Sequence, residues 1–258
     1  MAGRTTNRYI RTYVDEFDLS GYARSIGPLS QVYGEADLTV LTDAAKGYFP
    51  DQATVSPGTY NGVFDNTATS GFHVVGSNYT QNRVVTVAIG DRAAPVQGNP
   101  VFCGEYLQLS YSAEDDGGAV VANMPFGPNE QANLINYSKP WGTLAHALSA
   151  ADSDGNAAAL YQDGGSDATA FGGYMVYHVT SCNGDATIKM QHAATSADSD
   201  AADLAGCTTG VVDFSSGGSG VVTTTANTTS VNPFIRWQVV TGTATTITFV
   251  LSFVRASF

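Results

Sequence analysis

The sequence predicts a mainly β protein made of two domains, residues 1–130 and 131–258. It contains 28 Gly, 13 Tyr and 12 Phe, while only 13% of its residues are charged. This mixture suits short strands and tight turns better than helical bundles. In the second domain, short runs of alternating apolar and polar residues are separated by Gly, Asn, Asp and Ser turns. That pattern is typical of an antiparallel sandwich of the jelly-roll type.

The strands of the first domain are predicted from runs of β-branched and aromatic residues bounded by turn residues. In chain order they cover residues 9–14, 29–33, 59–64 and 83–89, followed by a longer pair at 101–113 and 119–126.

One helix is predicted between the second and third of these strands. Its apolar residues recur at spacings that place them on one face of a 3.6-residue period: Leu38, Leu41, Ala45 and Tyr48. Asp37 is a natural N-cap, and Gly47 and Pro50 supply the stop signals of a helix C-terminus. No reactive side chains cluster in this stretch, which indicates a scaffold.

The pair at 101–113 and 119–126 is predicted to form a long hairpin, because Asp116-Gly117 is a strong two-residue turn signal. Both faces of its first strand are partly apolar, which is more than a hairpin lying on a single core requires. We therefore expect one face to contact another subunit. The candidate oligomerisation residues are Val101, Cys103, Leu107, Leu109, Tyr111, Val120 and Met124.

Residues 128–167 are rich in Asn, Asp, Ser, Gly and Ala. This composition predicts a linker or an elaborate loop, with one helical turn near residues 144–148. We place the domain boundary inside this segment.

The same segment contains a pattern with the character of a metal site. The start of a calcium loop is resembled by the run Asp152-Ser-Asp154-Gly-Asn156, and Asp163 stands at the twelfth place of that loop. However, Ala157 stands where that loop needs glycine, and no flanking helix pair is evident. A solvated Asp-rich loop is the favoured interpretation, and no metal is expected.

The strands of the second domain are predicted at residues 173–180, 186–192, 208–212, 220–225, 234–240 and 245–254, with a surface loop at 195–203. In two of them, large apolar residues occupy every second position, and the positions between them are mostly polar. Their apolar faces, which we expect to form the second core, are Ile235, Trp237 and Val239, and Ile247, Phe249, Leu251 and Phe253.

The charge balance excludes one class of function. The chain has 23 Asp and Glu against 11 Lys and Arg, a formal net charge of -12 and a pI near 4.4. Such a surface repels a phosphate backbone, so a protein that reads or packages nucleic acid is not expected.

Catalysis is not expected either, because no nucleophile with a base and no pair of carboxylates in opposed environments is evident. The histidines lack metal-ligand spacing, and two of them lie in strand patterns where a hydrogen-bonded imidazole is the ordinary interpretation. The three cysteines are an odd number at wide spacings, which favours buried thiols over a disulfide framework. These residues are His73, His146, His178 and His192, and Cys103, Cys182 and Cys207. We predict neither an enzyme nor a cofactor.

Residues 1–8 lack the apolar core of a signal peptide, and no run of about 18 apolar residues could span a bilayer. We therefore expect synthesis in a cytoplasm and no membrane partner.

The first half of the chain resembles a known family, the tail tube (major tail) proteins of long-tailed bacteriophages of the siphophage type. The resemblance rests on a "DLSG" strand, an acidic-threonine helix start, a "D-A-x-K-x-Y-x-P" helix end and a "G-x-x-x-G-x-F-D" strand. In this sequence they are Asp18-Leu-Ser-Gly-Tyr22, Glu35-Ala-Asp-Leu-Thr39, Asp43-Ala-Ala-Lys46, Tyr48-Phe-Pro50, residues 58–65 and Ser70-Gly-Phe-His-Val-Val75. The second half is similar to the sandwich domains that phage tail and head proteins carry on their outer surface.

The resemblance implies a tail-tube-type β-sandwich or barrel domain whose long hairpin joins a continuous barrel around a central channel. It implies stacked rings, usually six-fold, in the tail of the virion. Its partners would be further copies of itself, other phage tail proteins, and the genomic DNA that passes through the channel during ejection. An acidic channel wall would let DNA pass without specific binding.

The appended second domain departs from the compact form of the family and keeps two alternatives open. One is a capsid decoration (cement) protein or another minor structural protein of the virion. The other is a carbohydrate-binding adhesin module, which would use Trp141 or Trp237 as a stacking platform.

Overall fold

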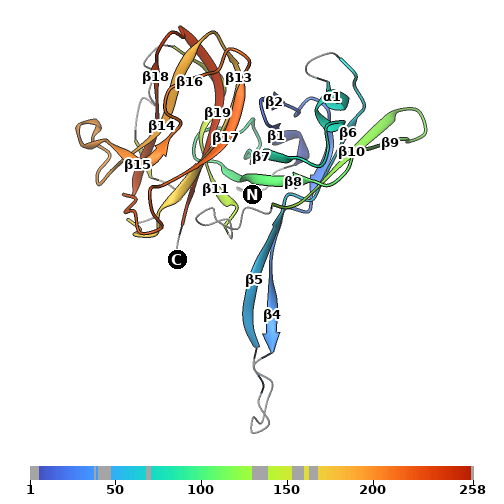
Figure 1. Ribbon diagram of the computed structural model, residues 1–258, viewed down its shortest axis with the longest axis horizontal. Coiled ribbons are helices and arrows are strands. Elements are labelled where there is room, and N and C mark those ends of the chain that lie inside the picture. Colours follow the sequence, from blue (N-terminus) through green and yellow to red (C-terminus); the bar gives the residue numbers. More distant parts are fainter. Residues whose placement is uncertain are drawn as a thin grey trace.

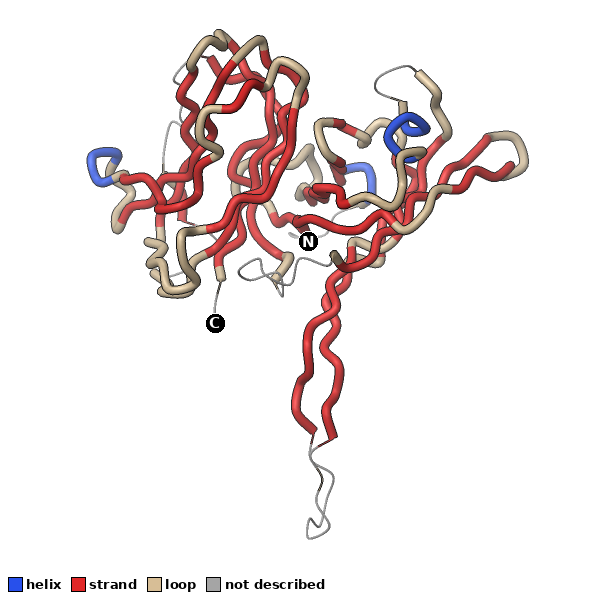
Figure 2. The backbone as a smooth tube through the Cα atoms, in the orientation of Figure 1, coloured by secondary structure: helices blue, strands red, loops and turns tan. Residues whose placement is uncertain are grey.

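The computed structural model describes residues 6–37, 39, 48–67, 71–129, 139–152, 160–162 and 168–256. Antiparallel strands make up most of its regular structure (Figure 1 and Figure 2). In the first half they are β1 (Ile10–Val14), β2 (Phe17–Asp18), β3 (Ala23–Gly27), β4 (Ser30–Asp37), β5 (Tyr48–Ser56), β6 (Thr59–Val63), β7 (Asn82–Ile89), β8 (Pro100–Gln108), β9 (Ser112–Asp115) and β10 (Val120–Pro128). The described helices of this half are a 3-10 turn, Asn7–Tyr9, and the helix α1 (Phe72–Gly76).

The second half continues the same architecture. Its strands are β11 (Trp141–Asp152), β12 (Tyr161–Gln162), β13 (Gly173–Cys182), β14 (Asp185–Ala193), β15 (Ala202–Thr208), β16 (Val212–Asp213), β17 (Gly218–Thr223), β18 (Phe234–Thr241) and β19 (Thr246–Arg255), with a 3-10 turn at Asp198–Asp200. The prediction of a mainly β protein with antiparallel sheets is confirmed.

The described strands form three sheets. A 12-stranded sheet follows the order β17-β13-β19-β11-β8-β10-β6-β3, with β1, β2, β7 and β9 branching from it. A 5-stranded sheet contains β12, β18, β14, β15 and β16, and a 2-stranded sheet contains β4 and β5. The strand β11 pairs with β8 on one side and β19 on the other, and so it joins the two halves.

Three apolar clusters hold these sheets together. The first lies between the 5-stranded sheet and β13 and β19, and it contains the predicted faces of both alternating strands, including Trp237 and Phe249. The second fills the first half around Tyr60, Phe72 and Phe102. The third packs residues of β1, β7 and β8 against residues of β11, β13 and β19. Because β19 contributes to the first and third clusters, both of its faces are buried.

Most of the predicted strands are confirmed. The strands β1, β6 and β7 were predicted at 9–14, 59–64 and 83–89, and the prediction at 29–33 is the start of the longer β4. In the second half, β13, β14, β17, β18 and β19 were predicted at 173–180, 186–192, 220–225, 234–240 and 245–254. The predicted hairpin is also present, with β9 and β10 meeting at the turn where the amide of Asp116 donates to the carbonyl of Ala119. Gly117 in this turn has φ +68, a value that glycine adopts without strain. Residues 109–111 separate β8 from β9, so the first strand is broken where a continuous one was expected.

The predicted helix is wrong at both of its ends. Asp37, the expected N-cap, is the last residue of β4, and Tyr48, the expected last apolar contact, begins β5. Leu38, Leu41 and Ala45 lie outside the described residues. The described helix α1 lies elsewhere, at Phe72–Gly76, where Phe72 and Val75 are buried.

The prediction of a linker with a helical turn near 144–148 is also wrong. These residues lie in β11, where Leu144 and Ala145 are buried. The strand is rich in Ala, which has low β propensity, but pairing on both sides outweighs that preference. The strand predicted at 208–212 is wrong as well, because this stretch connects β15 to β16. The predicted surface loop at 195–203 ends in β15, which begins at Ala202.

Candidate assembly surface

The strands β4 and β5 form a two-stranded ribbon, here called the arm, that extends away from the rest of the molecule (Figure 1). The two strands pair from Ser30 with Ser56 out to Asp37 with Tyr48, and the register shifts between Tyr33 and Glu35. Among the described strands, no third strand pairs with β4 or β5. An isolated two-stranded ribbon is marginally stable in water, so this geometry calls for a partner.

The base of the arm is fixed to the body by apolar and polar contacts. Val55 and Leu29 pack into the second cluster, and the hydroxyl of Ser56 donates to the carbonyl of Phe126 over 2.8 Å. The Ser56 hydroxyl oxygen also accepts from the amide of Gly58 at 3.0 Å. The arm therefore leaves the body from a fixed position.

Gly58 is where the chain turns from β5 into β6. Its φ is +71, and an added Cβ would lie 2.3 Å from the carbonyl carbon of Gly27. We expect Gly58→Ala to lower the free energy of unfolding by about 1–3 kcal/mol, because it adds a steric clash to an unfavourable φ. Urea unfolding measures the change. Gly98→Ala is the matched control, since Gly98 has φ +87 with open space around it. An equal loss of unfolding free energy in the two variants would show that the steric contact with Gly27 does not contribute to the effect.

The strand β4 of the arm exposes apolar and acidic side chains together. Val32 is 59% exposed and Tyr33 is 42% exposed, although the side-chain amide of Gln31 donates to the Tyr33 hydroxyl. Glu35 and Asp37 are exposed beyond them on the same strand. Hydrogen bonds from Thr39 to the Asp37 carboxylate lower the pKa of Asp37 below its ordinary value. An exposed apolar ribbon with open edges promotes pairing with another chain.

The residues predicted for oligomerisation on the second hairpin divide into two groups. Val101, Cys103 and Met124 are fully buried in this chain's own core, so they do not form part of its surface. Leu107 and Tyr111 are half-buried.

The exposed members of that set are Leu109 and Val120, with exposed fractions of 52% and 49%. They flank the acidic tip Glu114, Asp115 and Asp116, where Asp116 forms an ion pair with Arg24 at 2.5 Å. A role in subunit contact stays a prediction for these positions.

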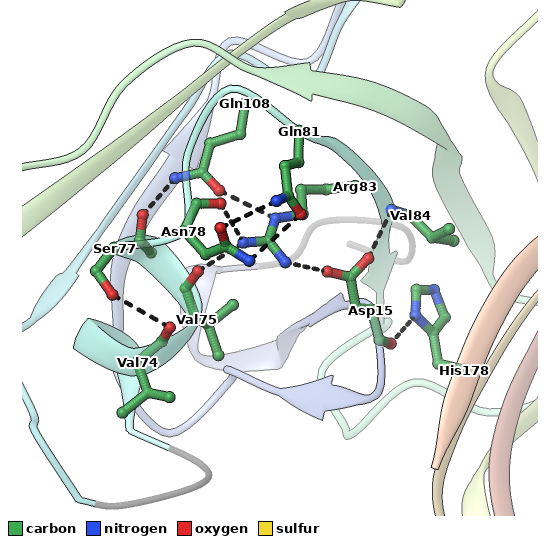
Figure 3. Close-up of polar contacts among 11 residues, drawn as sticks. Asp15, Val74, Val75, Ser77, Asn78, Gln81, Arg83, Val84, Gln108 and His178 are labelled. Atoms are coloured by element: carbon green, nitrogen blue, oxygen red, sulfur yellow. Dashed lines mark hydrogen bonds and ion pairs between the residues drawn. The ribbon is translucent and has the colours of Figure 1, made fainter. Parts of the chain in front are cut away.

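A buried polar cluster, the Arg83 network, stabilises the body from which the arm leaves (Figure 3). The guanidinium of Arg83 donates to the Asp15 carboxylate at 2.6 Å and to the side-chain oxygen of Gln108 at 3.1 Å. Its Nη2 also donates to the carbonyls of Val75 at 2.8 Å and Asn78 at 2.5 Å. One side chain thus connects the β1–β2 turn, β7, β8 and the segment around α1.

Asp15 extends this network to the second half of the molecule. Its carboxylate accepts from the amide of Val84, and its carbonyl accepts from Nδ1 of His178 on β13 at 2.6 Å (Figure 3). Nε2 of His178 lies 2.7 Å from the hydroxyl of Thr86, which donates to it in the neutral ring. Burial lowers the pKa of His178 to about 4. His178 is therefore a neutral structural residue that links the two halves.

The remaining predicted residues have structural positions. His146 is stacked on Phe249 and touches Trp237, and burial lowers its pKa to about 4. His192 accepts from the amide of Asn232, and burial lowers its pKa as well. His73 lies 3.2 Å from the hydroxyl of Tyr111.

Of the two tryptophans predicted as alternative stacking platforms, Trp237 is buried in the first cluster and does not present a surface. Trp141 is partly exposed and makes an edge contact with Phe102, and its role as a platform stays a prediction. Cys103 and Cys207 are buried free thiols, and Cys182 is a half-buried one. Asp154, Asn156, Ala157 and Asp163 lie outside the described residues.

No group of three or more His, Cys, Asp or Glu side chains in the described ranges is arranged to hold a metal ion. No helix in the described part of the chain is long and apolar enough to cross a membrane.

The sequence predicts the start of β4 at residues 29–33, but it does not predict the rest of the arm or the Arg83 network. The β-branched residues Thr54 and Val55 were a signal for β5, but the helical spacing before them led to a different interpretation. Nothing in the sequence links Asp15 with Arg83, because the two lie 68 positions apart.

No protein-family model matches the sequence. No curated protein matches it either. Among solved structures, the chain is similar to the Dit protein (gp 19.1) of SPP1, described as a paradigm of the hub adsorption apparatus in phages that infect Gram-positive bacteria. The two chains share 11% sequence identity, and the match covers 95% of this chain and 99% of that chain with a TM-score of 0.34. Similarity at this level carries no argument about function.

Proposed function

We propose that this chain is a structural protein of a bacteriophage tail whose copies associate into rings of the tail tube. The observation that carries the proposal is the arm, a ribbon that extends away from the body, pairs with no third strand among the described residues and exposes Val32 and Tyr33 (Figure 1). The order of sequence motifs in the first half, which resembles tail tube proteins, supports the same assignment.

The arm favours self-association of a particular kind. It occupies one side of the molecule, and when it meets a different surface of a second copy the contact is head-to-tail. Such head-to-tail contacts close into rings when the rotation between copies permits it. A ring of copies would also cover the open edges of the arm and reduce its tendency to aggregate.

The charge of the chain supports a channel for DNA. A formal net charge of -12 is spread over 258 residues, while Arg83, Arg236 and Arg255 are buried. An acidic wall provides no counterion release to the DNA backbone, so genomic DNA would pass during ejection without specific binding. We assign the ring to residues 1–130 and an outer position to residues 131–258. The partners are other copies and other tail proteins in the virion, after synthesis in the host cytoplasm, in a role that is not enzymatic.

We expect the purified wild-type protein to form rings or tubes as its concentration rises. Native mass spectrometry gives the number of copies, and negative-stain microscopy gives the shape. A chain that remains monomeric at millimolar concentration would contradict the proposal. Small discrete oligomers without an open channel would instead indicate a capsid decoration protein.

The double variant Val32→Asp/Tyr33→Asp is expected to raise the concentration for half-assembly by about 100-fold or more, because it places charges in an apolar contact. Light scattering across a dilution series measures this concentration. The control is Phe171→Asp/Val211→Asp, which adds two charges in place of an aromatic residue and a valine that are 43% and 75% exposed in the second half. If the arm variant and the control reach half-assembly at the same concentration, the arm is not part of the assembly interface.

A further inference from the structure

A pocket on the first half gathers an unusual share of the positive charge of this acidic chain. It has a volume of about 200 Å³ and is lined by Arg8 of the 3-10 turn, Arg11 of β1 and Arg24 of β3, with Ile10 and Ile26 between them. The sequence has only 11 Lys and Arg residues, and three of them meet here. We call this the arginine pocket.

Contacts within the chain orient these arginines at the rim of the pocket. Nη1 of Arg11 donates to the carbonyls of Arg8 and Ile10 at 3.2 and 3.0 Å. The guanidinium of Arg8 lies 5.9 Å from the centre of the Tyr9 ring, and Arg24 forms its ion pair with Asp116. Arg8 and Arg24 are exposed. The pocket therefore presents positive charge beside an apolar surface.

The chemistry of the arm complements this pocket. Glu35 and Asp37 are alternate residues beyond the register shift, so their side chains project from the same side of β4 about 6.5 Å apart. Tyr33 precedes the shift, and the strand thus offers one aromatic side chain followed by two exposed carboxylates. The aromatic ring of Tyr33 can pack on the apolar wall formed by Ile10 and Ile26. The carboxylates of Glu35 and Asp37 can accept hydrogen bonds from the guanidinium groups of the rim.

We propose that the arm of one copy docks into the arginine pocket of a second copy through Tyr33, Glu35 and Asp37. The occupant is a second copy because the arm extends away from its own body (Figure 1). The inference rests on the proposed ring assembly and names the two surfaces that meet in it. It is a head-to-tail contact, in which every copy uses both surfaces once.

Removing the charge of the pocket is the first test. The variant Arg8→Gln/Arg11→Gln is expected to raise the concentration for half-assembly at least about tenfold and to weaken its dependence on salt. The control is Thr228→Asp/Ser230→Asp, which makes the net charge equally more negative at two exposed positions of the second half. If the pocket variant assembles like the control, the docking proposal is overturned while the ring proposal stands.

Reversing the charges on the two surfaces in separate chains is the sharper test. One variant carries Arg8→Glu/Arg11→Glu, and the other carries Glu35→Arg/Asp37→Arg. Neither variant is expected to assemble alone, because its arm and its pocket then have the same sign of charge. An equimolar mixture restores both contacts and is expected to assemble with the two chains alternating, as native mass spectrometry of the mixed rings would show.

The outcomes of this test separate the two proposals. Circular dichroism first checks that each variant is folded. Mixed assemblies support the docking of arm into pocket, whereas folded variants that fail to assemble when mixed overturn it. Failure of the wild-type chain to assemble at all contradicts the proposed function itself.

Discussion

The variant Arg83→Ala is expected to lower the free energy of unfolding by about 3–5 kcal/mol, because it leaves a buried carboxylate without its partner. The side chains of Arg83 and Asp15 are 9% and 15% exposed, so water replaces little of the lost interaction. Gln108 and the carbonyls of Val75 and Asn78 also lose a donor. Urea unfolding below the assembly concentration, followed by tryptophan fluorescence, measures the change.

The matched control is Arg24→Ala, which removes an arginine from an ion pair whose side chains are 45% and 56% exposed. A surface pair of this kind contributes about 0–1 kcal/mol. A further variant, Arg83→Ala/Asp15→Asn, removes the unpaired charge, and asparagine tolerates the positive φ of residue 15. It should lose less stability than the two single variants together. Equal costs for Arg83→Ala and Arg24→Ala would contradict the role of the Arg83 network.

The free energy of unfolding is expected to fall steeply as the pH decreases from about 6.5 to about 4. Burial lowers the pKa of His146 and His178 from 6.5 to about 4, so between these values the unfolded chain binds protons that the folded chain excludes. Stability is therefore complete above the unfolded pKa and is lost as the pH falls toward the folded pKa. Each histidine accounts for about 3 kcal/mol over this range. His192, whose pKa is also lowered by burial, acts in the same direction.

The variant His146→Phe isolates one of these contributions. Phenylalanine can keep the stacking of residue 146 on Phe249 and its edge contact with Trp237, but it binds no proton. The slope of unfolding free energy against pH near pH 5 is expected to decrease by about 1.4 kcal/mol per pH unit, which corresponds to one proton. Urea unfolding at several pH values measures this slope. A slope that does not change would show that His146 is protonated in the folded chain.

The strands that the sequence predicts well have one clear physical property in common. Large apolar side chains occupy every second position of β18 and β19 because one face of each strand packs into the first cluster. The apolar periodicity of these strands is therefore visible in the sequence. The long hairpin was predictable for a different reason, since the turn at Asp116-Gly117 specifies a reversal by itself.

The elements that the sequence predicts poorly depend on distant contacts. β11 contains mostly small residues, and its conformation is determined by β8 and β19 on its two sides. The arm occurs where Leu38 and Tyr48 have helical spacing, yet Asp37 and Tyr48 pair with each other across two strands. Local spacing carries no information about such a pairing.

The candidate site was predictable only in its general character. The sequence indicated self-association from the apolar faces of residues 101–113, but Val101 and Cys103 proved to be buried. The exposed apolar residues of the arm lie in a stretch that the sequence indicated as a scaffold. The Arg83 network combines side chains from four separate parts of the chain, and no local pattern can specify that meeting.

The position of β11 restricts how the second half can be exchanged during evolution. Residues 100–102 of β8 are hydrogen-bonded to residues 141–143, so recombination after β10 must bring in a replacement strand for that edge. A module without such a strand would leave backbone amides and carbonyls open to strands of foreign chains. New outer modules are accommodated more easily by insertion at an exposed turn, such as the one beside Val211.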